Sequence, residues 1–414
     1  MQKIRIGVIG LGRGMCYIQQ AEDTGMELVA VCDKWEDKLK GSFPPEVALY
    51  TDYDEFLKHD MDAVVLANYF HEHAPFAIKA LKAGKHVMSE TSSNATMAEG
   101  VELCRAVEET GLIYMMAENY PYILPIQEMR RVYRSGEIGR VTYADGEYNH
   151  PCSVQDANNL SPGAYHWRNW LPPTYYCTHA LAPLMYVTDT MPVSVMALSI
   201  PALEPYEGTA RMNDSGSVIL CRMDNEAVFR VFGLVLPGHT NWYRFLGLRG
   251  GMEMTRGPGY FGPQQVRVWH EDYAASEDEL ADRVYSPKWP EHREEAEKAG
   301  HGGGDFFVNY HFANAIRTGV RPYLDVYRGV AMSSVGILAW KSALDGGRAY
   351  AMPDFSDEAS RRAYEDDHAS PFPDYVSGKA PGQLPSSVRG DVPRSAESME
   401  NARKAWRCTG YEGV

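Results

Sequence analysis

Three glycines and one acid near the N-terminus have the types and spacing of a dinucleotide-binding turn. Gly10, Gly12 and Gly14 follow an apolar segment over residues 3–10, and Asp33 comes 19 residues after Gly14. Gly10 would allow the tight turn, Gly12 would let the backbone approach a pyrophosphate, and the next helix would supply unpaired N–H groups. Asp33 would accept hydrogen bonds from a ribose diol. The chemistry expected of such a site is hydride transfer with a nicotinamide cofactor.

The glycine pattern departs from the common one at a single place. The third glycine or alanine would fall at Met15, whereas Gly14 comes one residue earlier. We expect Gly14 to permit the same close approach of helix and strand. Asp33 would repel a 2′-phosphate, so the sequence favours NAD over NADP. Arg13 and Lys34 are nearby cations that could hold such a phosphate, so NADP stays the alternative.

Alternating strands and helices predict the domain that positions this turn. Further apolar strands are predicted over residues 27–32, 62–68, 86–90 and 112–118. Helices are predicted to follow the first turn and to cover residues 73–83 and 97–110. This order is typical of an α/β fold with a doubly wound parallel sheet, here a Rossmann domain over residues 1–122.

Residues 123–355 have another character and predict a second, α+β domain. After a helix over 126–135, alternating apolar and polar residues predict strands over 141–148, 193–200, 216–221, 227–234 and 242–248. Two helices are predicted over 305–317 and 326–344. We expect a large mixed or antiparallel open sheet that serves substrate binding and oligomerisation. Residues 356–414 are rich in Pro, Ser, Asp and Gly, which predicts an extended C-terminal tail.

Composition limits the partners and the compartment. The chain has 414 residues and a net charge of −15, which argues against nucleic acid or an anionic membrane surface as a partner. No secretory signal and no apolar run of membrane-spanning length is found. The seven cysteines include no C-x-x-C pair, so reduced thiols in a cytoplasmic protein are expected.

Several segments resemble one oxidoreductase family. Residues 62–67, 73–75 and 80–87 are similar to the glucose–fructose oxidoreductase and inositol dehydrogenase family, Gfo/Idh/MocA. The resemblance implies a Rossmann domain joined to an open α/β sheet, NAD(P) as cofactor, and action on secondary hydroxyls of sugars or polyols. It also implies that the cofactor-binding residues are Gly10, Gly12, Arg13, Gly14, Asp33, Asn68, His73, Glu90 and Asn119.

A second set of motifs resembles one branch of that family. These motifs are Met115–Asn119, Tyr148–His150, Trp167–Arg168, Tyr176–His179 and Gly300–Phe306. They are similar to NAD-dependent glycoside hydrolases typified by bacterial α-N-acetylgalactosaminidases, which borrow a hydride and return it. That branch lacks the catalytic lysine of the simple dehydrogenases, and here the position is Thr91. Cys177 replaces the branch's usual proline and Thr91-Ser92 its Val-Pro, so the exact substrate stays open.

His179 and Tyr176 are the residues best suited to move protons. Oxidation of an alcohol needs a base for the hydroxyl proton, and a histidine near its ordinary pKa suits that role. Tyr176 could relay a proton or polarise a ketone, and three residues place it on the same helical face as His179. The alternatives are a hydrogen-bonded core histidine and a core aromatic residue.

Other polar residues are candidates for the surrounding site. Glu90 ends a strand at the edge where ligands bind, and helix capping is its alternative. We expect substrate contacts from His150, Trp167, Arg168, His301 and Asp305. A glycine-rich turn capping a helix is the alternative for Asp305. His71 and His73 do not predict a metal site, because neighbouring residues at a helix start rarely converge.

These observations predict an NAD-dependent enzyme that acts on a secondary hydroxyl of a sugar or glycoside. Redox-neutral cleavage of a glycoside through transient oxidation and elimination is the favoured interpretation. A simple sugar or polyol dehydrogenase and a non-catalytic NAD-bound sensor or scaffold are the alternatives. We expect a homodimer or homotetramer that pairs through the open sheet.

Overall fold

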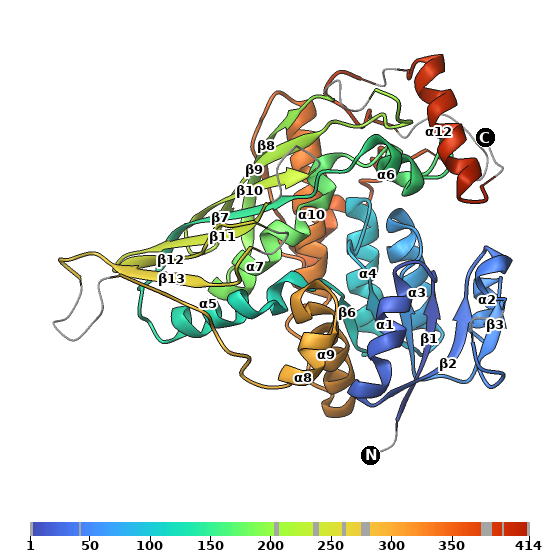
Figure 1. The fold of residues 1–414 in the computed structure, drawn as a ribbon, viewed down its shortest axis with the longest axis horizontal. Helices are drawn as coiled ribbons and strands as arrows, with labels where there is room; N and C mark the ends of the chain where they lie inside the picture. The colour runs from blue at the N-terminus through green and yellow to red at the C-terminus, as the bar shows by residue number, and fades with distance from the viewer. Residues whose placement is uncertain are drawn as a thin grey trace.

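The computed structural model describes residues 3–40, 43–202, 207–234, 240–258, 262–274, 282–373, 383–390 and 393–411. They build two sheets with helices packed against them, and the smaller sheet comes first in the chain (Figure 1).

The first sheet is the predicted Rossmann sheet. Its six parallel strands lie in the order β3-β2-β1-β4-β5-β6. They are β1 (Ile4–Ile9), β2 (Met26–Cys32), β3 (Ala48–Tyr50), β4 (Ala63–Leu66), β5 (His86–Ser89) and β6 (Tyr114–Met116). The helices are α1 (Gly14–Ala21), α2 (Tyr53–Phe56), α3 (His73–Lys82) and α4 (Met97–Thr110). The strand order reverses between β1 and β4, which is where ligands bind in such sheets.

Burial explains the apolar runs of these strands. Every residue of β4 is buried, because helices cover both faces of a parallel sheet. α4 begins with a capping box, in which Thr96 and Glu99 each accept a backbone N–H of the other.

The second sheet is large, open and mixed, as predicted. Its nine described strands lie in the order β14-β13-β12-β11-β7-β10-β9-β8-β15, and among them only β7 and β10 pair in parallel. The predicted strands are β7 (Val141–Asn149), β8 (Pro192–Ile200), β9 (Gly216–Met223), β10 (Val228–Leu234) and β11 (Thr240–Gly247). Four more were not predicted: β12 (Gly250–Met254), β13 (Val266–His270), β14 (Asp282–Tyr285) and β15 (Tyr350–Ala351).

Helices cover one face of this sheet and join it to the Rossmann domain. They are α5 (Leu124–Arg134), α7 (Thr178–Thr188) and α10 (Val326–Leu344). α10 packs against β8 on one side and α4 on the other, so it lies between the two sheets (Figure 1). Short α8 (Arg293–Lys298) leads to α9 (Gly304–Thr318), which packs against α1.

The C-terminal tail differs from the extended segment predicted. It contains α11 (Glu358–Arg361) and a longer helix, α12 (Ala396–Cys408). Ser395 caps α12, and the fully buried Trp406 donates from Nε1 to the carbonyl of Asn158 in α6 (Val154–Asn159). The tail therefore folds back over the second domain as a helix, beside α6 (Figure 1).

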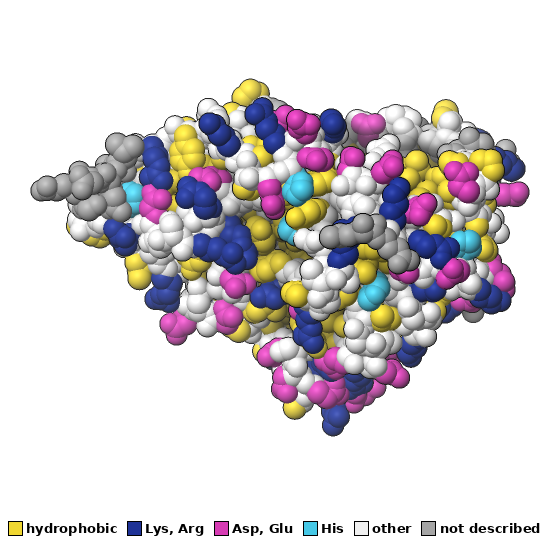
Figure 2. Space-filling view, turned by 90° about the horizontal axis from the view of Figure 1, so that it is seen from below, with side chains coloured by type: hydrophobic (Ala, Val, Ile, Leu, Met, Phe, Trp, Pro, Cys, Tyr) yellow, Lys and Arg dark blue, Asp and Glu magenta, His cyan; other side chains and the backbone are white. Residues whose placement is uncertain are grey.

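The surface carries charges of both signs. On the face that Figure 2 shows, basic and acidic side chains are interspersed among apolar ones. Within the described ranges, no helix combines the length and the apolar character needed to cross a bilayer.

Candidate active site

The three glycines of the first turn have distinct surroundings. A Cβ on Gly10, whose φ is 86°, would lie 2.2 Å from the carbonyl oxygen of Ala67. A Cβ on Gly14 would lie 2.8 Å from Val8 Cγ1, so Gly14 does permit the close approach of α1 to β1. A Cβ on Gly12 would meet no described atom within 4 Å, which leaves space for a ligand beside its backbone.

Asp33 is held by backbone donors at the end of β2. Its carboxylate accepts hydrogen bonds from the amides of Leu11, at 2.8 Å, and Trp35, at 2.9 Å. These bonds orient the carboxylate beside the glycine turn, as a ribose diol requires. The open space at Gly12 and the oriented acid together fit the adenosine half of NAD.

Arg13 points away from that half of the site. Its guanidinium donates to Glu90 Oε1 at 2.7 Å and to Asp305 Oδ1 at 2.6 Å. Lys34 places its ammonium 3.6 Å from the ring centre of Tyr69. Since Arg13 is engaged by two carboxylates, it braces the glycine turn.

Glu90 and Asp305 form the acidic part of this network. Glu90 also accepts from Tyr17 Oη at 2.7 Å and from the amide of Thr91 at 2.8 Å. Burial alone would raise the pKa of Glu90, but the charge and hydrogen bonds of Arg13 and Tyr17 outweigh it and lower that pKa. Thr91, at the position of the family's lysine, thus contacts Glu90.

Asp305 ties the second domain to the glycine turn. It lies in the first turn of α9 but does not cap the helix, because the N-cap is Gly303 with no side-chain bond. Its carboxylate contacts Arg13, Asn119 Nδ2 at 2.8 Å and His301 Nδ1 at 2.8 Å. Burial would raise the pKa of Asp305, but the bonds from His301 and Arg13 hold it far below its usual range.

His179 is paired with a buried glutamate. Its Nδ1 lies 2.7 Å from Glu118 Oε1 and 3.0 Å from Oε2. Glu118 is fully buried at the end of the β6 segment, and the His179 side chain keeps 11 % of its surface exposed. Because a carboxylate only accepts hydrogen bonds, Nδ1 carries the ring proton and donates a hydrogen bond to Glu118. Nε2 is then the ring nitrogen without a proton.

Aromatic rings surround this histidine. The ring centres of Tyr120 and Tyr148 lie 4.6 Å from that of His179, and the ring centre of Tyr176 lies 5.1 Å away. Tyr176 ends a 3-10 turn, residues Pro173–Tyr176, and His179 lies in the first turn of α7. A Cβ on Gly146 of β7 would lie 2.1 Å from the carbonyl of Ala180, so only glycine allows α7 to sit this close.

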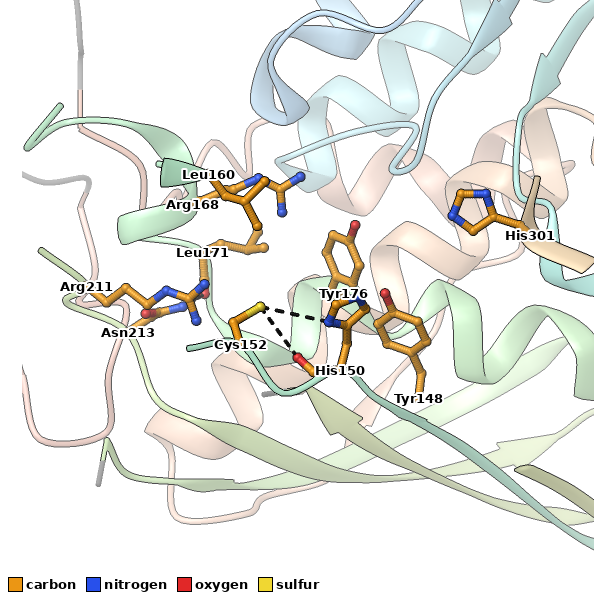
Figure 3. A pocket seen from close by; sticks show the side chains of 10 residues that line it. All are labelled: Tyr148, His150, Cys152, Leu160, Arg168, Leu171, Tyr176, Arg211, Asn213 and His301. Atoms are coloured by element: carbon orange, nitrogen blue, oxygen red, sulfur yellow. Dashed lines mark hydrogen bonds between the residues drawn. The ribbon is translucent and has the colours of Figure 1, made fainter. Parts of the chain in front are cut away.

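A pocket of about 320 Å³ opens beside these tyrosines (Figure 3). It is lined by Tyr148, His150, Cys152, Leu160, Arg168, Leu171, Tyr176, Arg211, Asn213 and His301. Four of the predicted residues, Tyr176, His150, Arg168 and His301, therefore come together. His179 lies behind Tyr148 and Tyr176, and Asp305 lies behind His301.

Trp167 supports the pocket without lining it. Its ring is buried and stacks on Phe70, with ring centres 5.2 Å apart. The guanidinium of Arg168 lies 4.3 Å from the centre of the Trp167 ring. Trp167 thus fixes the direction of Arg168, which is a different role from the direct substrate contact predicted.

The remaining predicted cofactor residues lie at the switch point. Asn68 follows β4, and its Oδ1 is buried without a hydrogen-bond partner among the described residues, as is Oδ1 of Asn119. His73 uses Nδ1 on the carbonyl of Ser92, at 2.8 Å, and Nε2 faces the carbonyl of Asn68, at 3.3 Å. His73 therefore positions these two loops. Among the described residues, no group of three or more potential ligands is arranged to hold a metal ion.

Several site residues were not predicted. Glu118 stands at a strand end, as Glu90 does, and that position was a signal that could have identified it. Tyr148 was quoted only within a motif. Cys152, Arg211 and Asn213 lie in loops and carry no local signal, because only the tertiary fold brings them to the pocket.

Two family models match the chain. Residues 4–118 match the oxidoreductase family, NAD-binding Rossmann fold (Gfo/Idh/MocA), and residues 252–361 match the glycosyl hydrolase 109 C-terminal domain.

Relatives and a solved structure match most of the length of the chain. A glycosyl hydrolase family 109 protein of Solibacter usitatus is 27% identical over 85% of this chain and 88% of its own length. An alpha-N-acetylgalactosaminidase of Shewanella oneidensis is 26% identical over 90% of this chain and 88% of its own length. A levoglucosan dehydrogenase in complex with NADH shares the fold, with a TM-score of 0.71 and 20% identity over 85% of this chain and 100% of its own. The chain therefore joins an NAD-binding Rossmann domain of the Gfo/Idh/MocA family to a C-terminal domain of glycosyl hydrolase family 109.

Proposed function

We propose that this protein uses NAD to cleave a glycoside without net oxidation. The observation that carries the proposal is the buried Glu118–His179 pair, which adjoins Tyr148 and Tyr176 at the wall of the pocket. The names of the relatives support a glycoside as substrate, and the NADH-bound neighbour supports the cofactor.

The residues that would hold NAD are Gly10, Gly12, Gly14 and Asp33, with Asn68, Glu90 and Asn119 toward the nicotinamide end. Bound NAD⁺ would supply a hydride acceptor for a secondary hydroxyl and return the hydride at the end of the cycle. Arg13 and Asp305 would keep the glycine turn, Glu90 and Asn119 in fixed relation.

His179 would act as general base through Nε2. It would take the proton of the hydroxyl at C3 while the hydride leaves C3 for the acceptor, and the ketone so formed would acidify the hydrogen at C2. Loss of the C2 proton drives the bond between C1 and the aglycone to break, with a proton supplied to the departing oxygen. Water then adds at C1 while C2 regains a proton. Tyr176 would donate a hydrogen bond to the ketone oxygen, and no pair of catalytic carboxylates is needed.

Turnover in deuterated water tests this cycle. Aryl glycosides incubated with the NAD-loaded protein should release sugar carrying deuterium at C2, with no accumulation of NADH. Stoichiometric NADH from a free sugar would instead identify a simple dehydrogenase. Bound NAD with no turnover of any glycoside or sugar would identify a sensor or scaffold.

A further inference from the structure

Two arginines lie at one end of the pocket. Arg168 and Arg211 both line it, and none of its described lining residues is Asp or Glu. Figure 3 shows both guanidinium groups pointing inward from one side, with Tyr176, Tyr148 and His301 on the other. The pocket therefore has a cationic end and an end next to the reacting residues.

Arg211 is unusually buried for an arginine. The residue keeps only 8% of its surface exposed. Burying a guanidinium costs free energy, which anionic or hydrogen-bonding groups around it must offset.

Hydrogen bonds fix the segment that carries Arg211. The amide of Gly208 donates to Ser398 Oγ of α12 at 2.8 Å, and Asn158 Nδ2 of α6 donates to the carbonyl of Gly208 at 2.8 Å. Ala210 packs against Ala402 and Trp406 of α12. The tail helix thus holds this segment in place.

The same segment is bonded to the turn that carries Arg168. The amide of Met212 donates to the carbonyl of Asn169 at 2.7 Å, and Asn213 Nδ2 donates to the carbonyl of Leu171. Arg168 itself is fixed over Trp167. The two backbone segments that carry Arg168 and Arg211 are therefore held in a set relation before any ligand binds, which lowers the entropic cost of binding.

We propose that Arg168 and Arg211 form a subsite for an anionic substituent, so that the substrate is an acidic sugar. A guanidinium matches a carboxylate, sulfate or phosphate group through paired N–H donors. The chain carries a net charge of −15, so a cationic pocket end contrasts with the protein as a whole. A uronic acid or a sugar esterified at O6 with sulfate or phosphate has this chemistry.

The geometry also places the anionic group on the sugar. In a pyranose ring, C5 lies across from C2, the carbon whose proton the proposed cycle removes. With C2 and C3 directed toward Tyr176 and His179, a carboxylate or O6 ester on C5 would extend to the arginines. This assignment rests on the proposed function for the position of C2 and C3.

Matched substrates test the subsite. The NAD-loaded protein is assayed with 4-nitrophenyl glucuronide and galacturonide, the corresponding glucoside and galactoside, and their 6-sulfates and 6-phosphates, in both anomers. Calorimetry with free glucuronate, galacturonate, glucose and galactose measures binding without turnover. The variants are Arg211→Gln, Arg211→Lys and Arg168→Gln, with Arg222→Gln, an exposed arginine of β9, as control.

We expect kcat/KM to favour one class of acidic substrate. Arg211→Gln should lower kcat/KM for that substrate by about 10- to 100-fold and leave neutral sugars nearly unaffected, which is the range for one charged hydrogen bond. Arg211→Lys should retain part of the preference, and Arg222→Gln all of it. NAD affinity and the melting temperature confirm that each variant is folded.

Equal kcat/KM for neutral and acidic sugars, or a preference unchanged in both Arg211→Gln and Arg168→Gln, would overturn the subsite. The two proposals can fail separately. Arginine-dependent binding of acidic sugars without cleavage would retain the subsite and reject the hydrolytic cycle. Cleavage of neutral glycosides with deuterium at C2, and no binding of acidic sugars, would retain the hydrolytic cycle and reject the subsite.

Discussion

Glu118 determines which nitrogen of His179 can act as a base. Because Nδ1 donates to this buried carboxylate, Nε2 is left to accept a proton. Replacing His179 by Ala should lower turnover by roughly 10²–10⁴-fold, the usual contribution of a general base. Glu118→Gln keeps the shape but lets the amide donate toward Nδ1, so it should lower kcat by at least about tenfold through loss of the correct tautomer.

Thr91→Ala is the matched comparison, since Thr91 contacts Glu90 and lies outside the His179 pair. Its kcat should stay close to that of the wild type. Steady-state kinetics give kcat and KM, and calorimetry confirms that each variant still binds NAD. A fully active His179→Ala protein would reject this site.

Asp33 should set the choice of cofactor. Its carboxylate, held by the amides of Leu11 and Trp35, would meet a 2′-phosphate with like charge, and Arg13 is already engaged by Glu90 and Asp305. We expect NAD(H) to bind more tightly than NADP(H), and Asp33→Ala to narrow the difference. Titration calorimetry on cofactor-stripped protein measures both affinities, and tighter NADP(H) binding by the wild type would contradict the expectation.

Single residues were predictable where a motif or a strand end located them. Tyr176 and His179 do meet, because their spacing in the chain already places them within one turn. Arg211 was not predictable, since its place in the pocket depends on bonds to α6, α12 and the turn after Trp167. Asp305 was predicted to contact the substrate, but in the structure it binds Arg13, which comes from the other end of the chain.

Among the elements, α4 carries a titratable group in its N-terminal cap. Glu99 Oε2 accepts from the amides of Ala95, at 2.8 Å, and Thr96, at 3.2 Å. Burial raises the pKa of Glu99 to about 7, although these bonds oppose the rise. A carboxyl whose folded pKa exceeds its unfolded value favours folding while protonated. Stability from this group is therefore present at low pH and lost as pH rises from about 4.5 to about 7.

Glu99→Gln removes this titration and keeps an acceptor for both amides. Relative to the wild type, the variant should gain stability across that pH interval, by about 3 kcal/mol, since one pKa unit corresponds to about 1.4 kcal/mol. Urea unfolding at several pH values measures the difference. An unchanged difference between the two proteins from low to neutral pH would show that the Glu99 carboxyl does not titrate with folding.

Helices and strands were predictable where their apolar pattern extended over many residues. The Rossmann strands are apolar runs bounded by turns, and α10 was predicted at its observed bounds, Val326–Leu344. β3 has three residues and β15 two, too few for a periodic pattern. α12 was missed because its stability depends on burying Ala402 and Trp406 against distant residues.

At the scale of the whole molecule, the outer face of the second sheet remains open to a partner. Met196 and Leu220 lie opposite each other on β8 and β9, and Leu198 lies on the same face; their exposed fractions are 39%, 38% and 62%. Farther along the face, Asp145 is covered by Arg230 and Arg244. Exposed apolar patches of this kind mark interaction surfaces. We therefore expect a homodimer or homotetramer that pairs through this sheet.

Light scattering at micromolar concentration tests this assembly. The wild type should have the mass of a dimer or tetramer, and the double variant Leu198→Asp, Leu220→Asp should shift toward the monomer, because paired faces would bury the new carboxylates among apolar side chains. Leu49→Asp, at an exposed leucine of β3 in the other sheet, should leave the mass unchanged. A wild type that is monomeric throughout, or a double variant that keeps the wild-type mass, would show that this face is not the interface.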